Sequence, residues 1–125
     1  MVDLRKIKSI IEIDFRDIVD QIFIKEINEM LIILKDDTFI DIWFSLKLKN
    51  RYSYHWERKF KDGSLYRHDN IPHLKWENVP TFPRHFHNGS EGNVEESYIN
   101  SDIEKGLPQF LQFARQKMKD DISEI

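Results

Sequence analysis

The chain has 125 residues and a formal net charge of −3, long enough for one domain with its own hydrophobic core. It contains no cysteine, which excludes disulfides, cysteine-held metal centres and thiol nucleophiles, and which fits a reducing cytoplasm. The apolar runs are too short to span a membrane, and the first residues lead into no apolar signal segment. We therefore expect a soluble cytoplasmic protein that acts without a membrane.

Near the N-terminus, apolar residues recur at helical spacing and predict a short amphipathic helix over residues 3–13. Beyond this helix, apolar residues alternate with polar ones, which indicates β-strands. We predict strands in three successive segments, at residues 20–27, 29–35 and 38–45. Asp36-Asp37 joins the last two strands and has the length of a tight hairpin turn.

A second hairpin is predicted at Asp62-Gly63, a dipeptide typical of two-residue turns. It joins two further strands, at residues 51–60 and 64–68. With a two-residue loop, Phe60 faces Leu65 on the side of the core. In the same register Glu57 faces His68 on the opposite side, which we expect to carry the chemistry.

Residues 71–97 are rich in proline and glycine and predict an ordered loop rather than a further pair of strands. The motif Ser101-Asp102-Ile103-Glu104 then resembles a helix capping box, and a helical apolar face follows it, with a kink or restart expected at Pro108. These elements predict one α+β domain over residues 1–125. It consists of an N-terminal helix, an antiparallel sheet of about five strands, a Pro/His-rich loop and a C-terminal helix covering one sheet face.

Every histidine of the chain lies in one stretch, at His55, His68, His73, His85 and His87. The same part of the chain is basic: residues 47–87 carry a net charge of +5, whereas the residues before and after them each sum to −4. Histidine exchanges protons near neutral pH and also binds metals, so we expect the chemistry here. The basic centre suits RNA or another polyanion, whose binding should weaken as salt rises.

Three motifs follow one another in this stretch, at Tyr52–Glu57, Asp62–His73 and Thr81–Gly89. Together they resemble the TumE-type toxin family of toxin–antitoxin modules, and the match covers roughly residues 50–90. This sequence has His68 and Arg84 at two positions where the family pattern has tyrosine and histidine. The resemblance implies toxicity and a cognate antitoxin, a helix-turn-helix protein encoded alongside.

The residue types of this stretch favour metal-independent RNA cleavage, a reaction that needs no cofactor. It requires a base for the 2′-hydroxyl proton, an acid for the leaving oxygen and cations for the charge on the phosphorane. The predicted site residues on the hairpin are His55, Glu57, Arg67 and His68, with Lys59 and Arg84 in reserve. The loop provides a second tier that closes over the substrate, formed by His73, His85 and His87.

Other interpretations stay open. His85 and His87 lie two residues apart in an extended segment, so we expect both imidazoles to point to the same side. With His73 or Asp69 they would form the ligand set of a metal-dependent hydrolase. A non-enzymatic module whose basic face binds a polyanion or a protein is another alternative, and a homodimer is also left open. Each histidine could equally serve only in packing, as we expect for the aromatic side chains of Tyr52, Tyr54 and Trp56.

Overall fold

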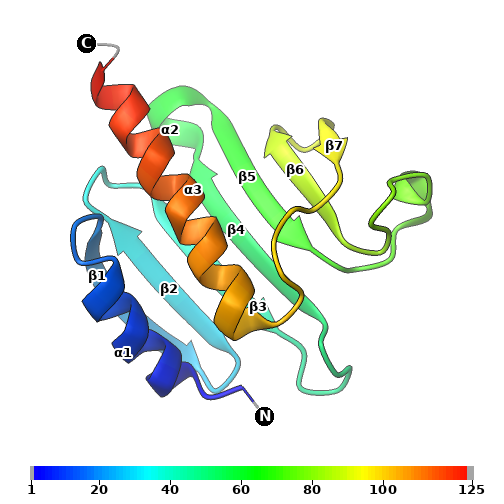
Figure 1. Ribbon diagram of the computed structural model, residues 1–125, viewed down its shortest axis with the longest axis horizontal. Coiled ribbons are helices and arrows are strands. Elements are labelled where there is room, and N and C mark those ends of the chain that lie inside the picture. The colour runs from blue at the N-terminus through cyan, green and yellow to red at the C-terminus, as the bar shows by residue number, and fades with distance from the viewer. Residues whose placement is uncertain (1, 124–125) are drawn as a thin grey trace.

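The computed structural model describes residues 2–123, in which two long helices pack on one antiparallel sheet (Figure 1). The elements in chain order are α1 (Leu4–Asp14), β1 (Val19–Glu26), β2 (Glu29–Leu34), β3 (Phe39–Phe44), β4 (Tyr52–Arg58), α2 (Lys59–Asp62), β5 (Ser64–Asp69), the 3₁₀ helix η1 (Leu74–Trp76), β6 (His85–Gly89), β7 (Val94–Glu95) and α3 (Ile103–Ser123). The predicted α+β class, with a helix at each end, is confirmed. Across residues 2–123, no helix is long and apolar enough to cross a membrane.

The sheet is a meander in which each strand pairs antiparallel with the next, in the order β1 to β7. It has seven strands rather than about five, because β6 pairs with β5 and β7 pairs with β6. The prediction of a loop throughout residues 71–97 is therefore wrong at its C-terminal end. The prolines that indicated a loop, at positions 72, 80 and 83, all precede β6, whose own residues keep the backbone N–H groups that pairing requires.

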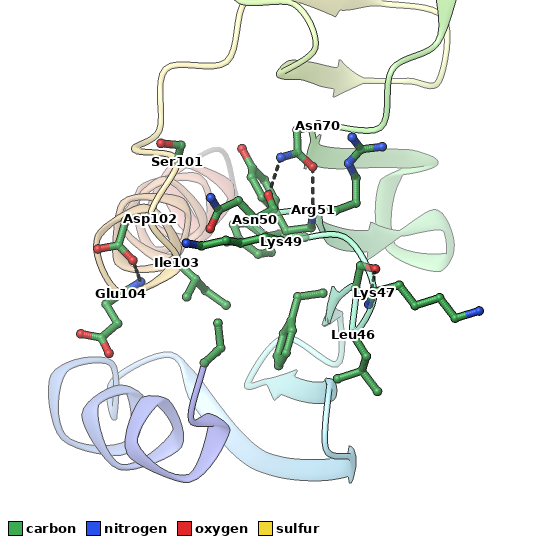
Figure 2. A pocket seen from close by; sticks show the side chains of 15 residues that line it. Leu46, Lys47, Lys49, Asn50, Arg51, Asn70, Ser101, Asp102, Ile103 and Glu104 are labelled. Carbon is green, nitrogen blue, oxygen red and sulfur yellow. Dashed lines mark hydrogen bonds between the residues drawn. The ribbon is translucent and has the colours of Figure 1, made fainter.

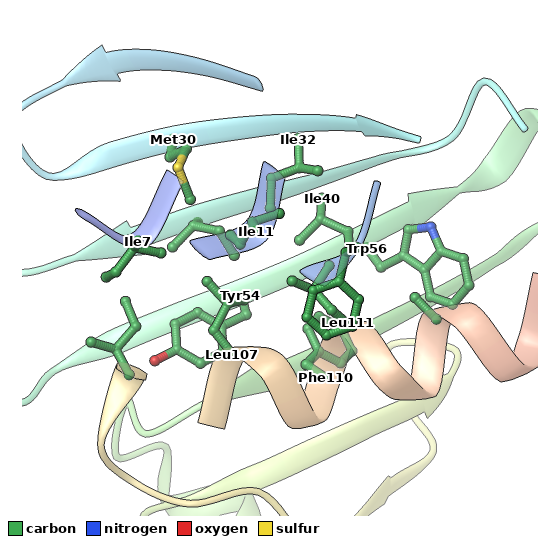
Figure 3. Close-up of a cluster of buried hydrophobic side chains, with 14 of the residues drawn as sticks. Ile7, Ile11, Met30, Ile32, Ile40, Tyr54, Trp56, Leu107, Phe110 and Leu111 are labelled. Atoms are coloured by element: carbon green, nitrogen blue, oxygen red, sulfur yellow. The ribbon is translucent and has the colours of Figure 1, made fainter. Parts of the chain in front are cut away.

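Helices α1 and α3 lie on the same face of the sheet, which we call the covered face (Figures 1 and 3). Alternate strand residues are buried beneath them, including Met30, Ile32, Ile40, Tyr54 and Trp56. The helices contribute Ile7, Ile11, Leu107, Phe110 and Leu111 to the same core. Each such side chain stabilises the fold by about 1.5–3 kcal/mol when fully buried. The expected packing role of the aromatic residues of β4 is confirmed.

Helix α3 runs from Ile103 through Pro108 to Ser123 as one helix, so the restart that was one of the two alternatives at Pro108 does not occur. A proline in a helix interior costs about 3 kcal/mol. Here the buried apolar face of α3 outweighs that cost. The backbone N–H of Glu104 donates to Asp102 Oδ1 at 3.3 Å, so Asp102, rather than the predicted Ser101, caps the helix.

The hairpin at Asp62-Gly63 is present, but α2 forms its turn instead of a two-residue loop. The turn ends at Gly63, whose φ of 77° is readily adopted only by glycine. Arg58 explains the helical turn: it is buried and donates to Asp62 Oδ2 from both Nε, at 3.2 Å, and Nη2, at 3.0 Å. Residues four apart lie side by side on a helix. Phe60, predicted in the core, lies on α2 and is 98% exposed.

The helical turn changes the predicted register between β4 and β5. Tyr54 pairs with His68, and Glu57 pairs with Leu65. Because successive strand residues point to opposite faces, this shift moves His68 from the face of His55 to the covered face. The predicted pairing of Glu57 with His68 is therefore wrong.

Candidate functional site

The face of the sheet opposite α1 and α3, here called the open face, brings together polar residues from three adjacent strands. Arg67 on β5 pairs with His55 on β4 and with His87 on β6. Residues two positions away from these three on the same strands, in either direction, lie on the same face. We call the resulting group the Arg67 cluster; it comprises His55, Glu57, Arg67, Asp69, His85, His87 and, from the β6–β7 turn, Glu91.

Arg67 lies at the centre of the cluster, with an imidazole on either side. Its Nη1 lies 3.4 Å from His55 Nδ1, and its Nη2 lies 3.1 Å from His87 Nε2. Its Nε donates to Asp69 Oδ2 at 3.2 Å. A guanidinium only donates hydrogen bonds, so each imidazole nitrogen that faces Arg67 must accept with its lone pair. Two imidazole lone pairs thus converge on one cation.

Glu57 sets the tautomer of His55. His55 Nε2 lies 3.2 Å from Glu57 Oε1, and a carboxylate can only accept, so the proton of the ring is on Nε2. Burial would raise the pKa of Glu57, but the backbone N–H of Lys59 and the His55 ring outweigh it and hold the pKa below its usual value. A carboxylate in this position also stabilises the imidazolium that forms when Nδ1 takes up a proton.

His87 is held as a neutral ring. Its Nδ1 donates to the backbone carbonyl of Glu91 at 2.8 Å, which leaves the lone pair on Nε2, towards Arg67. Burial lowers the pKa of His87, and the neighbouring Arg67 guanidinium lowers it further. The Trp76 ring and the imidazole pack edge to face, with centroids 6.0 Å apart. His87 is therefore a buried base that is unprotonated at neutral pH.

His85 differs from His87 because both of its ring nitrogens face acceptors. Nδ1 donates to the Pro83 carbonyl at 2.9 Å, and Nε2 lies 3.2 Å from Asp69 Oδ1. Burial alone would lower the pKa of His85, but the bond to Asp69 and the Pro83 carbonyl raise it above its usual value. Burial likewise opposes the charge on Asp69, and His85 with the Ile71 backbone N–H holds its pKa low. The two form a buried ion pair at one end of the cluster.

His68 lies in the core instead of the cluster. It is buried, stacks on Phe86 with centroids 4.2 Å apart, and its Nδ1 lies 2.9 Å from Ser97 Oγ. Its Nε2 has no hydrogen-bond partner among the described residues. Burial lowers the pKa of His68 to about 3, so the ring is neutral in the folded protein. This environment is that of a packing residue.

The buried ring of His68 predicts a specific acid sensitivity. The pKa of His68 is 6.5 in the unfolded chain and about 3 in the folded one. Between these two pH values the unfolded chain binds a proton at His68 that the folded chain does not, so stability falls as pH falls. His68→Phe keeps the stacking and removes the titration. Below pH 6.5, we expect the unfolding free energy measured in urea to fall less steeply with pH in His68→Phe than in the wild type. The two slopes should differ by up to about 1.4 kcal/mol per pH unit. The exposed His73, changed to Phe, is the control; equal slopes for all three proteins would contradict the prediction.

The remaining predicted residues lie outside the cluster. His73 is exposed and accepts a hydrogen bond from the Lys75 backbone N–H through Nδ1. Arg84 donates to the Ile99 carbonyl at 2.7 Å and so anchors the segment before α3. The side chain of Lys59 is exposed at the start of α2. Of the seven predicted site residues, the structure thus gathers five, which are His55, Glu57, Arg67, His85 and His87.

A pocket of about 770 Å³ lies elsewhere, between the β3–β4 loop and the start of α3 (Figure 2). Within the described part of the chain, its lining includes none of the predicted site residues, but it includes three cations of the basic stretch, Lys47, Lys49 and Arg51. Asn70, which follows Asp69, donates to the Asn50 carbonyl in its wall (Figure 2). The basic stretch is therefore divided between this pocket and the open face.

The open face also contains a set of metal-ligand types. Ligand atoms of Asp69, His85 and His87 lie within 4.8 Å of one another, and all three residues are buried. The prediction that His85 and His87 point to the same side is thus confirmed, and Asp69 rather than His73 completes the group. The Arg67 guanidinium already contacts His87 and Asp69, so a divalent ion there would lie against a fixed positive charge.

The sequence did not predict Glu91 as a site residue, and it predicted a different role for Asp69. The sequence predicts Asp69 as a metal ligand, although its position two residues after Arg67 on one strand places both on the same face. No site predicted from the sequence includes Glu91, because it lies in the turn after β6. No spacing rule relates a turn residue to β5, so only the strand pairing could reveal it.

Comparison with known proteins assigns the chain to a class. A family model of toxins matches residues 8–118, nearly the whole chain, so this protein is the toxin component of a toxin–antitoxin module. The description of that model is Toxin TumE, and the chain belongs to this family, as the motifs predicted. The family suggests an antitoxin as the partner. No curated protein and no solved structure matches the chain.

Proposed function

We propose that this toxin is a metal-independent ribonuclease whose active site is the Arg67 cluster. The observation that carries the proposal is the pair of imidazole lone pairs, from His55 and His87, on either side of one guanidinium. RNA cleavage by its own 2′-hydroxyl needs this combination, with one ring as base, one as acid and a cation for the phosphorane.

The two rings differ in the way that such a reaction requires. His87 is buried, neutral and has its lone pair on Nε2, so it is assigned as the base that takes the 2′-hydroxyl proton. His55 Nδ1 is assigned as the acid: before the reaction it takes up a proton from solvent, and Glu57 behind the ring stabilises the resulting imidazolium. The 2′-oxygen attacks phosphorus, the bond to the 5′-oxygen breaks, and that oxygen receives the proton of His55. The products are a 2′,3′-cyclic phosphate and a 5′-hydroxyl.

The other cluster residues support this assignment. The Arg67 guanidinium stabilises the negative charge that develops on the phosphorane. Asp69, which is paired with His85, accepts a hydrogen bond from Arg67 Nε and so fixes the position of the guanidinium. Lys47, Lys49 and Arg51 lie around the pocket beside Asn70 and provide contacts for further phosphates of the RNA strand. The antitoxin that neutralises this activity is, in our proposal, a helix-turn-helix protein encoded alongside the toxin.

The test is cleavage of RNA by the purified toxin, with the new ends mapped. His55→Ala and His87→Ala are each expected to slow cleavage by about 10²–10⁴-fold, the usual contribution of one acid or base. His73→Ala, which changes an exposed histidine outside the cluster, should cleave like the wild type. Ends other than a cyclic phosphate and a 5′-hydroxyl, or full activity of both cluster variants, would contradict the proposal.

A second candidate function is a metal-dependent hydrolase, because Asp69, His85 and His87 are close enough to share an ion. The same assay separates the two. Activity that a chelator abolishes and a divalent cation restores supports the metal site, whereas activity that a chelator leaves unchanged supports the acid–base mechanism.

A further inference from the structure

The β6–β7 turn places one carboxylate directly on the candidate site. Glu91 binds Arg67 with both of its oxygens, Oε1 on Nη1 and Oε2 on Nη2, the latter at 2.8 Å. These are the two guanidinium nitrogens that also contact His55 and His87. The carboxylate therefore lies at the point where the two imidazoles and the cation converge.

This arrangement is the one that an arginine uses to bind a phosphate. Two parallel N–H groups of a guanidinium match two oxygens of a carboxylate or of a phosphate equally well. The oxygens of Glu91 thus occupy the positions that two phosphate oxygens would take on Arg67. The bond to Arg67 also holds the pKa of Glu91 below its usual value, so the group is ionised.

We propose that Glu91 is an internal phosphate mimic, whose carboxylate fills the phosphate-binding subsite of Arg67 until the substrate phosphate displaces it. This inference rests on the proposed function, since it assigns the position of the scissile phosphate in the same site. Glu91 then reduces the affinity of the free toxin for RNA without taking part in the proton transfers.

The local structure allows Glu91 to leave without disturbing the base. Its side chain is 61% exposed, whereas the side chain of Arg67 is 20% exposed. The backbone carbonyl of Glu91 accepts the Nδ1 proton of His87, and this bond persists when only the side chain rotates. Solvent around the largely exposed Glu91 carboxylate screens its attraction to Arg67. Displacement therefore needs rotation of one surface side chain and leaves the tautomer of His87 in place.

The experiment titrates inorganic phosphate into the purified full chain and follows the ring protons of His55 and His87 by NMR. We expect Glu91→Gln to bind phosphate at least about tenfold more tightly than the wild type, because a like charge next to the ligand is removed. Glu95→Gln is the matched control. It removes the same charge from the same hairpin, where Glu95 is exposed and contacts only the Asn88 side chain among the described hydrogen bonds.

The outcomes separate this inference from the proposed ribonuclease activity. Equal phosphate affinity in Glu91→Gln, Glu95→Gln and the wild type would overturn the mimic, even if the wild type cuts RNA. Tighter phosphate binding that is confined to Glu91→Gln supports it, even if no RNA is cut. In a toxin that cuts RNA, Glu91→Gln should cut at least as fast at low substrate concentration. A loss as large as that of His55→Ala would make Glu91 a catalytic group and overturn the inference.

Discussion

Replacing Arg67 with alanine is expected to lower the rate of RNA cleavage by about 10²–10³-fold, the usual effect of removing one group that stabilises developing charge. Arg67 is the only residue of the cluster that contacts both imidazoles proposed as acid and base. Its loss therefore removes the cation for the phosphorane and the contact that orients both rings. The rate is measured with a labelled RNA under single-turnover conditions.

Arg67→Lys distinguishes the geometry from the charge. A lysine ammonium keeps the charge but lacks the planar fork that reaches both rings, so we expect it to restore little of the lost rate. Lys75→Ala removes an exposed cation of the same basic stretch and should change the rate only a few-fold. A rate for Arg67→Ala within a few-fold of the wild type would show that the cluster is not the catalytic site.

The largest effect on stability is expected from Arg58→Ala, which should lower the free energy of unfolding by about 3–5 kcal/mol, as when one partner of a buried ion pair is removed. The side chain of Arg58 is 0% exposed and binds three carboxylates, those of Asp36, Asp62 and Asp121. It also packs on Trp56, at 4.6 Å from the ring centroid. Removal of Arg58 leaves three like charges close together and a cavity beside the ring.

Urea unfolding monitored by tryptophan fluorescence measures this effect. The matched control is Arg5→Ala, because Arg5 has an exposed side chain that lies 4.0 Å from Asp3. Exposed pairs of this kind contribute about 0–1 kcal/mol. If Arg58→Ala unfolded at the same urea concentration as Arg5→Ala, the buried network would not be a determinant of stability. Arg58 also sets the β4–β5 turn, so its variant is expected to weaken RNA cleavage through the fold.

The sequence predicted the elements well where one kind of spacing extended over many residues. The alternation of Tyr52, Tyr54 and Trp56 predicted the buried face of β4, and the pair His85 and His87 predicted two imidazoles on one side. Such predictions depend only on the periods of helices and strands, which are properties of the local backbone. The adjacency of His55 and Glu57 on one face was predicted for the same reason.

Two features of the site depended on contacts between distant residues. The face of His68 was predicted wrongly, because Arg58 attracts Asp62 and turns a two-residue loop into a helical turn, which changes the register of β5. His87 came next to Arg67 only because β6 pairs with β5.

Composition and periodicity thus determined the α+β class, the basic and histidine-rich centre and the residues that share a face along a single strand. The tertiary structure alone decided which strands are neighbours, and it brought Asp69 and Glu91 to Arg67. The physical reason is that a strand's period of two is encoded locally, whereas the register between strands is the result of a competition among buried charges, turns and core packing along the whole chain.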